Sequence, residues 1–139
     1  MKHLLFILGL AIFFSFPGLA ATRSVLVVVD GFKETKGKLM IGIYDSDSTF
    51  MKTIYKGYSK EVLDTTLEFA FELPEGEYAI SVYHDVNENN TLDVDSYGMP
   101  TESYGFSYNV QGQWGPPSFN DCKFLVAADS TVIRINLFH

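Results

Sequence analysis

The sequence predicts an all-β protein, an antiparallel β-sandwich of about seven strands. Two observations favour this class. Short runs rich in Val, Ile, Phe and Tyr alternate apolar and polar residues and are separated by Gly, Pro, Asn and Asp. No clear long helix is indicated by the spacing of apolar residues. The chain therefore suits two sheets packed face to face around one modest core.

The expected strands follow from these runs in chain order. Residues 24–30 are β-branched and apolar on both faces, as in a covered strand. Residues 38–44 place Leu39, Ile41 and Ile43 on one face. Residues 66–73 alternate most clearly. The inward positions are Leu67, Phe69, Phe71 and Leu73, and the outward positions are Thr66, Glu68, Ala70 and Glu72.

A turn at Pro74-Glu75-Gly76 leads into the next expected strand, residues 77–84, which ends at a polar loop. The last two expected strands are residues 122–127 and 131–138, joined near Asp129-Ser130. In the final strand Ile133, Ile135 and Leu137 should face the core, with Arg134 and Asn136 in solvent.

Two stretches do not fit a strand pattern. Residues 46–63 carry partly helical spacings, such as Phe50, Ile54 and Tyr58, which indicate a short helix or an irregular crossover. Residues 99–119 are rich in Gly, Pro and aromatic residues and predict a long ordered loop. Loops of this length are uncommon in compact domains unless they are functional or held in place.

Residues 1–20 predict a secretory signal peptide, which leaves residues 21–139 as a single β-sandwich domain. An apolar run over residues 4–16 follows Lys2 and ends before Pro17. The alternative is an uncleaved membrane anchor, but the run is shorter than the roughly 20 residues that span a bilayer. We therefore expect an exported protein, periplasmic or extracellular, with no membrane insertion after cleavage.

The net charge limits the classes of binding partner, and the cysteine content limits the disulfides that the chain can form. Without Lys2, nine basic residues face 17 acidic ones, a net charge of −8. This balance argues against nucleic acid and against an anionic membrane surface, and it suits a cation. Cys122 is the only cysteine, so no disulfide can form within the chain. Its alternation with Phe124 and Val126 predicts a buried core residue rather than a reactive thiol.

The loop after His84 carries the pattern of a calcium site. Ca²⁺ is bound by alternating Asp and Asn oxygens and by a backbone carbonyl at the seventh place of such a loop. Asn90 falls at the sixth place, where the backbone needs φ > 0 and Asn is tolerated next after Gly. The expected loop ligands of a structural Ca²⁺ are Asp85, Asn87, Asn89, the carbonyl of Thr91, and Asp93.

The twelfth place holds Ser96 rather than the bidentate Glu of an EF-hand, so a distal carboxylate must complete the site. Glu102 is the first candidate, followed by Asp95 and then by Asp45 or Asp47. So few carboxylates predict a dissociation constant on the order of 10⁻⁵ to 10⁻³ M.

Two other interpretations of this loop stay open. Asp and Asn gather in turns without any ion, because they hydrogen-bond their own backbone. Asn89-Asn90-Thr91 is also a glycosylation sequon, which matters only in a eukaryotic secretory pathway.

A hydrolase is the alternative from another functional class, with an acid cluster of His84, Asp85 and Glu102. The sequence has no Gly-x-Ser-x-Gly nucleophile elbow and too few His and Cys residues for a zinc site. We therefore expect no catalytic residue and interpret His84 as a strand residue beside the loop.

The aromatic residues of the long loop allow a third interpretation. Tyr104, Phe106 and Trp114 could form a platform for a carbohydrate or a peptide. They could equally form a hydrophobic lid, which the loop's glycines favour because they permit close backbone packing.

Four motifs in order give the chain a resemblance to one family. They are Leu73-Pro74-Glu75-Gly76-Glu77-Tyr78, His84-Asp85-x-Asn87-x-Asn89 with Asp93, Gly98-x-Pro100-x-Glu102-x-x-Gly105-Phe106-Ser107, and Pro116-Pro117-Ser118-Phe119. Over residues 24–138 the chain resembles the domain of unknown function 2141 family of secreted bacterial proteins. Its usual Asn-Gly in the loop is Asn89-Asn90 here.

This resemblance implies an exported bacterial protein with a prealbumin-like or immunoglobulin-like β-sandwich and no assigned activity. The Leu-Pro-x-Gly-x-Tyr step is also similar to one in carboxypeptidase-regulatory-like and collagen-adhesin B-type modules, which are binding or structural modules rather than enzymes. The expected role is an accessory or binding module with an unknown protein or glycan partner.

Overall fold

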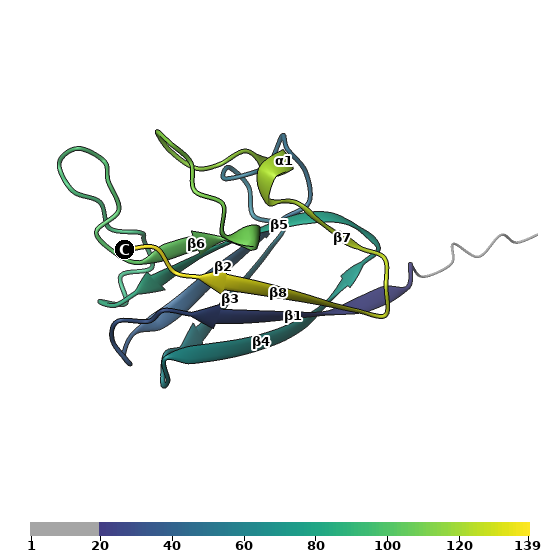
Figure 1. Ribbon diagram of the computed structural model, residues 1–139, viewed down its shortest axis with the longest axis horizontal. Helices are drawn as coiled ribbons and strands as arrows, with labels where there is room; N and C mark the ends of the chain where they lie inside the picture. The colour runs from purple at the N-terminus through teal and green to yellow at the C-terminus, as the bar shows by residue number, and fades with distance from the viewer. Residues whose placement is uncertain (1–19) are drawn as a thin grey trace, which may run out of the picture.

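The computed structural model describes residues 20–139, which form a β-sandwich (Figure 1). The strands of this part are β1 (Thr22–Asp30), β2 (Lys38–Tyr44), β3 (Lys56–Glu61), β4 (Thr66–Pro74), β5 (Gly76–Asp85), β6 (Tyr104–Phe106), β7 (Phe124–Val126) and β8 (Ser130–Asn136). A 3₁₀ turn, η1 (Ser107–Asn109), and a short helix, α1 (Phe119–Cys122), lie between β6 and β7. The expected class is confirmed, and the expected signal peptide lies outside the described residues except for Ala20.

One layer is a three-stranded sheet with the order β4-β1-β8. β1 pairs with β4 in antiparallel fashion, and Val27 lies opposite Phe69. β1 pairs with β8 in parallel fashion, and Val27 lies opposite Ile133. The sandwich is thus not wholly antiparallel. On the inner face of the central strand Val25, Val27 and Val29 are fully buried, whereas on its outer face Val28 is buried and Leu26 is partly exposed.

The second layer is a five-stranded sheet with the order β3-β2-β5-β6, and β7 adds to the first part of β5. β2 and β5 are antiparallel neighbours, with Lys38 opposite Asp85 and Tyr44 opposite Ala79. The chain that follows Tyr44 therefore lies at the opposite end of the sheet from Asp85. Asp45 and Asp47 cannot complete a site at Asp85, so the expectation that one of them could be the distal carboxylate is wrong.

The main core lies between the two sheets. Leu39, Ile41 and Ile43 of β2 face Val25, Val27 and Val29 of β1 in one buried cluster. Ile133, Ile135 and Leu137 belong to the same cluster, as expected from their alternation. The inward residues of β4 also join it, with Phe69 partly buried. Alternation with a period of two therefore predicts the inner face correctly.

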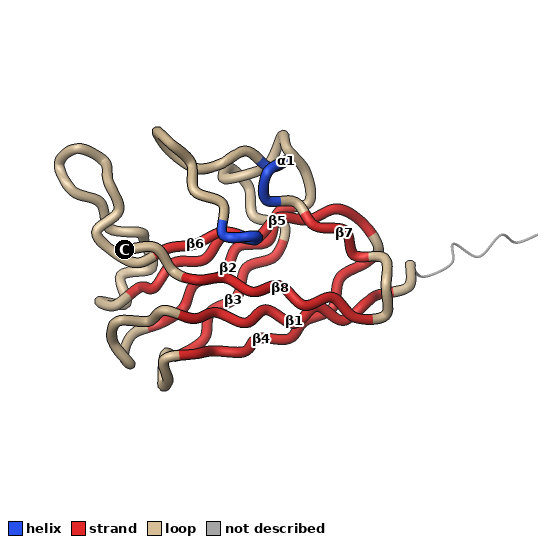
Figure 2. Tube along the Cα trace, in the orientation of Figure 1, coloured by secondary structure: helices blue, strands red, loops and turns tan. Residues whose placement is uncertain are grey.

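A second, smaller core covers one end of the five-stranded sheet on its outer face. It consists of Tyr44, Phe50, Ala79, Phe106, Phe119 and Cys122, with Tyr104 and Val110 packed against them. The loop that follows Tyr44 and the segment from η1 to α1 supply half of these side chains, and β2, β5 and β6 supply the others. Figure 2 shows these connections as tan loops and a short blue helix above the red strands.

Cys122 is fully buried, which confirms that part of its prediction, but it ends α1 instead of starting a strand. The Ser118 hydroxyl accepts the backbone N–H of Asp121 and starts this helical turn, so β7 begins only at Phe124. Burial raises the pKa of the Cys122 thiol to about 11, which keeps it protonated at neutral pH.

Residues 46–63 contain the strand β3 instead of a helix or an irregular crossover. Only their first part is a turn, in which the Ser46 carbonyl accepts the N–H of Phe50. The four-residue spacing of Phe50, Ile54 and Tyr58 resembles that of a helix, but these side chains do not share one face of a helix. Phe50 enters the outer cluster, whereas Tyr58 packs on Phe69 and Phe71 between the sheets.

Candidate functional site

The polar loop begins where β5 ends, and Asp85 is its anchor. The Asp85 side chain is 0% exposed. Its Oδ1 accepts the N–H of Asn89 at 3.1 Å and its Oδ2 accepts the N–H of Asn90 at 2.8 Å. Gly37 approaches the backbone of Asp85 so closely that a Cβ there would overlap it. The first residue of the loop is thus held from both sides.

The backbone at Asn90 has the conformation that the sequence predicts for the sixth place. Its φ is +63°, in the left-handed region that Asn tolerates better than most residues. Glu88 also has a positive φ, +58°, and its carboxylate pairs with Lys38 at 2.9 Å. The loop is therefore a tightly wound turn despite having no glycine.

The middle of the loop forms a chain of hydrogen bonds. Asn87 Oδ1 accepts the N–H of Asn89 at 3.1 Å, and Asn89 Oδ1 accepts the N–H of Thr91 at 2.9 Å. Both side-chain amides donate to Asp93, with Asn87 Nδ2 at 2.6 Å and Asn89 Nδ2 at 2.8 Å from its two oxygens. The two Asn side chains and the Asp93 carboxylate are thus in direct contact.

Glu102 comes from a distant part of the chain and closes the loop. Its Oε1 accepts the N–H of Val86 at 2.9 Å, and its Oε2 accepts the N–H of Asp93 at 3.1 Å. The structure therefore brings the first distal candidate to both ends of the loop. Asp95 instead accepts the N–H groups of Tyr97 and Met99 and closes its own turn.

These contacts define a polar cluster of two carboxylates and two amides at one loop, with a third carboxylate, Glu102, beneath it. As arranged, every one of these side chains hydrogen-bonds within the cluster. Among residues 20–139, no group of three or more His, Cys, Asp or Glu side chains is placed to hold a metal ion. Calcium would therefore have to replace hydrogen bonds that the loop now makes.

Of the three residues of the hydrolase hypothesis, His84 and Glu102 line one polar pocket, whereas Asp85 does not. Tyr78, Ile80 and Val82 of β5 point into the main core, so His84 points the same way and Asp85 points outward. The buried His84 ring stacks edge-on against Phe32, and its Nε2 lies 2.7 Å from the Lys36 carbonyl oxygen. The contacts of His84 are thus those of a structural residue in a strand.

A polar pocket of about 330 Å³ lies beside Glu102. His84, Ser103 and His139 line it, and Ser103 Oγ lies 2.6 Å from His139 Nδ1. Burial lowers the pKa of His139, and the nearby charge of Lys33 adds to this. Sequence reasoning did not find this contact, because only the pairing of Tyr104 with Phe138 brings the two segments together.

The aromatic residues of the long loop divide into two groups. Phe106 is buried and Tyr104 is partly buried in the outer cluster, the placement that the lid interpretation expects. Trp114 is 99% exposed. The three residues therefore do not form one continuous platform.

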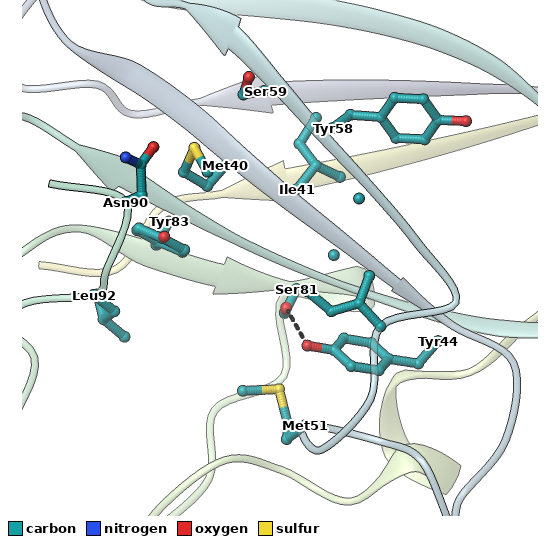
Figure 3. A pocket seen from close by; sticks show the side chains of 13 residues that line it. Met40, Ile41, Tyr44, Met51, Tyr58, Ser59, Ser81, Tyr83, Asn90 and Leu92 are labelled. Carbon is teal, nitrogen blue, oxygen red and sulfur yellow. Dashed lines mark hydrogen bonds between the residues drawn. The ribbon is translucent and has the colours of Figure 1, made fainter. Parts of the chain in front are cut away.

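A larger groove of about 490 Å³ lies on the outer face of the five-stranded sheet, between the outer cluster and the polar loop (Figure 3). Tyr44 and Met51 border one side, and Met40, Tyr83 and Asn90 border the other. Burial raises the pKa of Tyr83, with a smaller contribution from Asp85. In the sequence, this groove could have been found only from Gly42 and Gly57. A glycine inside a strand often marks a place where a ligand or another backbone approaches the strand closely.

The described residues thus form a β-sandwich with its polar loop and its groove on one sheet. A family model described as "Uncharacterized protein conserved in bacteria (DUF2141)" matches residues 27–134. The chain belongs to this family, which confirms the resemblance of its motifs. No curated protein and no solved structure matches the chain, so the prealbumin-like arrangement stays a prediction.

Within the described residues, 20–139, no helix is long and apolar enough to cross a membrane.

Proposed function

We propose that this protein is an exported, non-catalytic β-sandwich module whose polar loop binds a structural Ca²⁺. The ligands are Asp85, Asn87, Asn89, the Thr91 carbonyl and Asp93, with Glu102 completing the site. One observation carries the proposal. Asn87 and Asn89 converge on the Asp93 carboxylate in a loop whose sixth residue has the positive φ of a calcium loop.

Binding requires a small change in this cluster. The Nδ2 groups of Asn87 and Asn89 occupy the two oxygens of Asp93, where the cation would bind. Asn87 Oδ1 accepts one N–H and has a second lone pair for an ion, whereas Asn89 Oδ1 accepts both the N–H and the hydroxyl of Thr91. Ca²⁺ accepts irregular sets of six to eight oxygens, so rotation of the two Asn side chains and of the Thr91 hydroxyl is sufficient.

A non-catalytic role is supported by the way in which the polar groups are used. The oxygens of Asp85 and Glu102 accept backbone N–H groups, and Nε2 of the buried His84 lies 2.7 Å from the Lys36 carbonyl oxygen. These contacts hold the side chains in place around the loop, which favours a structural role over a catalytic one.

Calorimetric titration with CaCl₂ tests the proposal, with Asp93→Asn as the diagnostic variant. Asp85 is a poor choice, because it is fully buried and its oxygens accept the N–H groups of Asn89 and Asn90, so its removal would also disturb the shape of the loop. We expect a dissociation constant on the order of 10⁻⁵ to 10⁻³ M, weakened at least about tenfold by Asp93→Asn.

Asp47→Asn is the matched control, because Asp47 is an exposed carboxylate at the opposite end of the sheet. It should leave the affinity unchanged. No binding of Ca²⁺ by the wild-type protein, or equal binding by Asp93→Asn, would reduce the loop to a turn stabilised by Asp and Asn alone.

A further inference from the structure

The groove on the outer face of the five-stranded sheet has an open floor because small residues line up across three strands. Gly42 of β2 lies opposite Gly57 of β3 on one side and opposite Ser81 of β5 on the other. A Cβ at Gly57 would meet nothing closer than 3.7 Å, whereas one at Gly42 would meet the Tyr44 hydroxyl at 3.2 Å. The open space therefore lies above Gly57, and the Tyr44 hydroxyl borders it at Gly42. The groove thus crosses the strands rather than following one of them.

Larger side chains form the walls of this groove. Met51 and Ile54, from the connection between β2 and β3, are 41% and 53% exposed at one side. Met40 and Tyr83 stand at the other side, and Asn90 and Leu92 of the polar loop extend that wall (Figure 3). The volume of about 490 Å³ is within the range of about 300–1,000 Å³ typical of small-molecule sites.

The charge of the lining restricts the occupant. None of the residues around the groove is Asp, Glu, Lys or Arg, although 27 of the 139 residues of the chain are. The polar pocket beside Glu102 differs in this respect, because Lys33 and Glu34 line it. A charged ligand would lose water in the groove without gaining a counter-charge, so an uncharged ligand fits best.

The polar groups of the groove indicate what kind of uncharged ligand this is. Hydroxyls of Tyr44, Ser59, Ser81 and Tyr83 and the amide of Asn90 surround an apolar surface. The Tyr44 and Ser81 hydroxyls are 3.4 Å apart, a long contact that leaves both able to bind a ligand. A sugar ring presents hydroxyls at its edge and C–H groups on its face, which matches this lining.

A peptide main chain matches it less well. Strand addition requires unpaired backbone groups, and β2 at the centre of the floor is paired on both sides, with β3 and with β5. Recognition in the groove must therefore come from side-chain hydroxyls, amides and apolar surface. We propose that this groove binds a neutral oligosaccharide, lying across β3, β2 and β5.

An array of immobilised oligosaccharides tests this inference with the full exported protein. It should carry neutral glucans, mannans and N-acetylglucosamine oligomers, their sulfated and sialylated counterparts, and apolar peptides. We expect binding to members of the neutral set only. Affinity is then measured by calorimetry with the best neutral oligosaccharide, in EDTA and in CaCl₂.

Gly57→Tyr is the blocking variant, because its side chain would fill the floor and Tyr is favoured in strands. It should weaken binding at least about tenfold. Ala70→Tyr is the matched control, an exposed strand position on the other sheet, and should bind like the wild type. Equal melting temperatures of the two variants will show that both fold.

Absence of binding to every neutral oligosaccharide, preference for charged sugars or peptides, or full binding by Gly57→Tyr would each overturn the inference. The inference does not rest on the calcium proposal. Glycan binding together with no binding of Ca²⁺ in the calorimetric titration would reject the metal site and retain the groove, whereas Ca²⁺ binding without glycan binding would do the reverse.

Discussion

Two carboxylates act on the polar loop in the same way, although they lie 17 residues apart. Asp85 and Glu102 each accept two backbone N–H groups, and hydrogen bonds to a charged group are stronger than those between neutral groups. The loop therefore has a defined shape before any ion binds. Pre-organisation of this kind lowers the entropic cost of binding a ligand.

The Glu102→Ala substitution tests this role. It leaves the N–H groups of Val86 and Asp93 to water, because both residues are partly exposed. We expect the free energy of unfolding in EDTA to fall by about 2 kcal/mol, measured by urea denaturation. The exposed Glu68→Ala should change it by less than about 0.5 kcal/mol. Equal effects of the two substitutions would show that Glu102 does not hold the loop.

Cys122 gives a prediction for alkaline pH. Burial raises the pKa of its thiol from 9.0 to about 11 in the folded protein. Between pH 9 and pH 11 the unfolded chain has lost the thiol proton while the folded protein still holds it, so rising pH favours the unfolded state. The contribution of the protonated thiol to stability is therefore complete below pH 9 and is lost as the pH rises to 11. The free energy of unfolding should therefore fall more steeply across this range in the wild type than in Cys122→Ala. Parallel curves would contradict the burial argument.

At the scale of elements, strands with regular alternation could be predicted, and elements defined by long-range pairing could not. β4 and β8 each face one core, so their period of two is visible in the sequence. β3 has only one apolar residue in its six, Tyr58, and is a strand because β2 pairs with it. The parallel pairing of β1 with β8 likewise cannot be recognised from the sequence of either strand.

The candidate site divides in the same way. The Asp85–Asp93 spacing and the positive φ at Asn90 depend on local backbone chemistry, and the sequence contains that information. The groove depends on Gly42, Gly57 and Ser81 lying side by side, which follows only from the register of three strands. Asp45 and Asp47 were considered near Asp85 because strand directions cannot be counted without knowing which strands pair.

β3 also protects an exposed edge of the other sheet. The Nζ atoms of Lys56 and Lys60 lie 3.3 and 2.7 Å from the carbonyl oxygens of Glu72 and Glu68, on the edge of β4 that does not face β1. An unpaired edge is a template for association between chains, and lysines are a common protection.

Replacing both lysines by methionine should therefore promote aggregation. We expect light scattering during prolonged incubation to rise in the double variant. A double variant with Lys33→Met and Lys52→Met has the same charge and is altered in connecting segments. It should stay monodisperse. Equal scattering by both variants would show that net charge, not edge protection, is responsible.

For the whole molecule, the outer face of the five-stranded sheet concentrates the features that bear on function. The outer cluster covers one end, the groove crosses the middle, and the polar loop closes the other end. Asn90 and Leu92 belong to both the loop and the groove wall. An ion that fixed the loop would thus also fix one wall of the groove, which links the two proposals physically.

The melting temperature of the purified protein in EDTA, in millimolar CaCl₂ and in millimolar MgCl₂ tests the central claim most directly. At a free Ca²⁺ concentration 100 times the dissociation constant, binding adds about 2.7 kcal/mol of stability. For the expected dissociation constants, millimolar Ca²⁺ adds about 0.4 to 2.7 kcal/mol, so we expect a rise of roughly 2–10 °C with Ca²⁺. Mg²⁺ should change the melting temperature little, because it keeps its bound waters. Identical melting temperatures in all three solutions would contradict a calcium site in the Asp85–Asp93 loop.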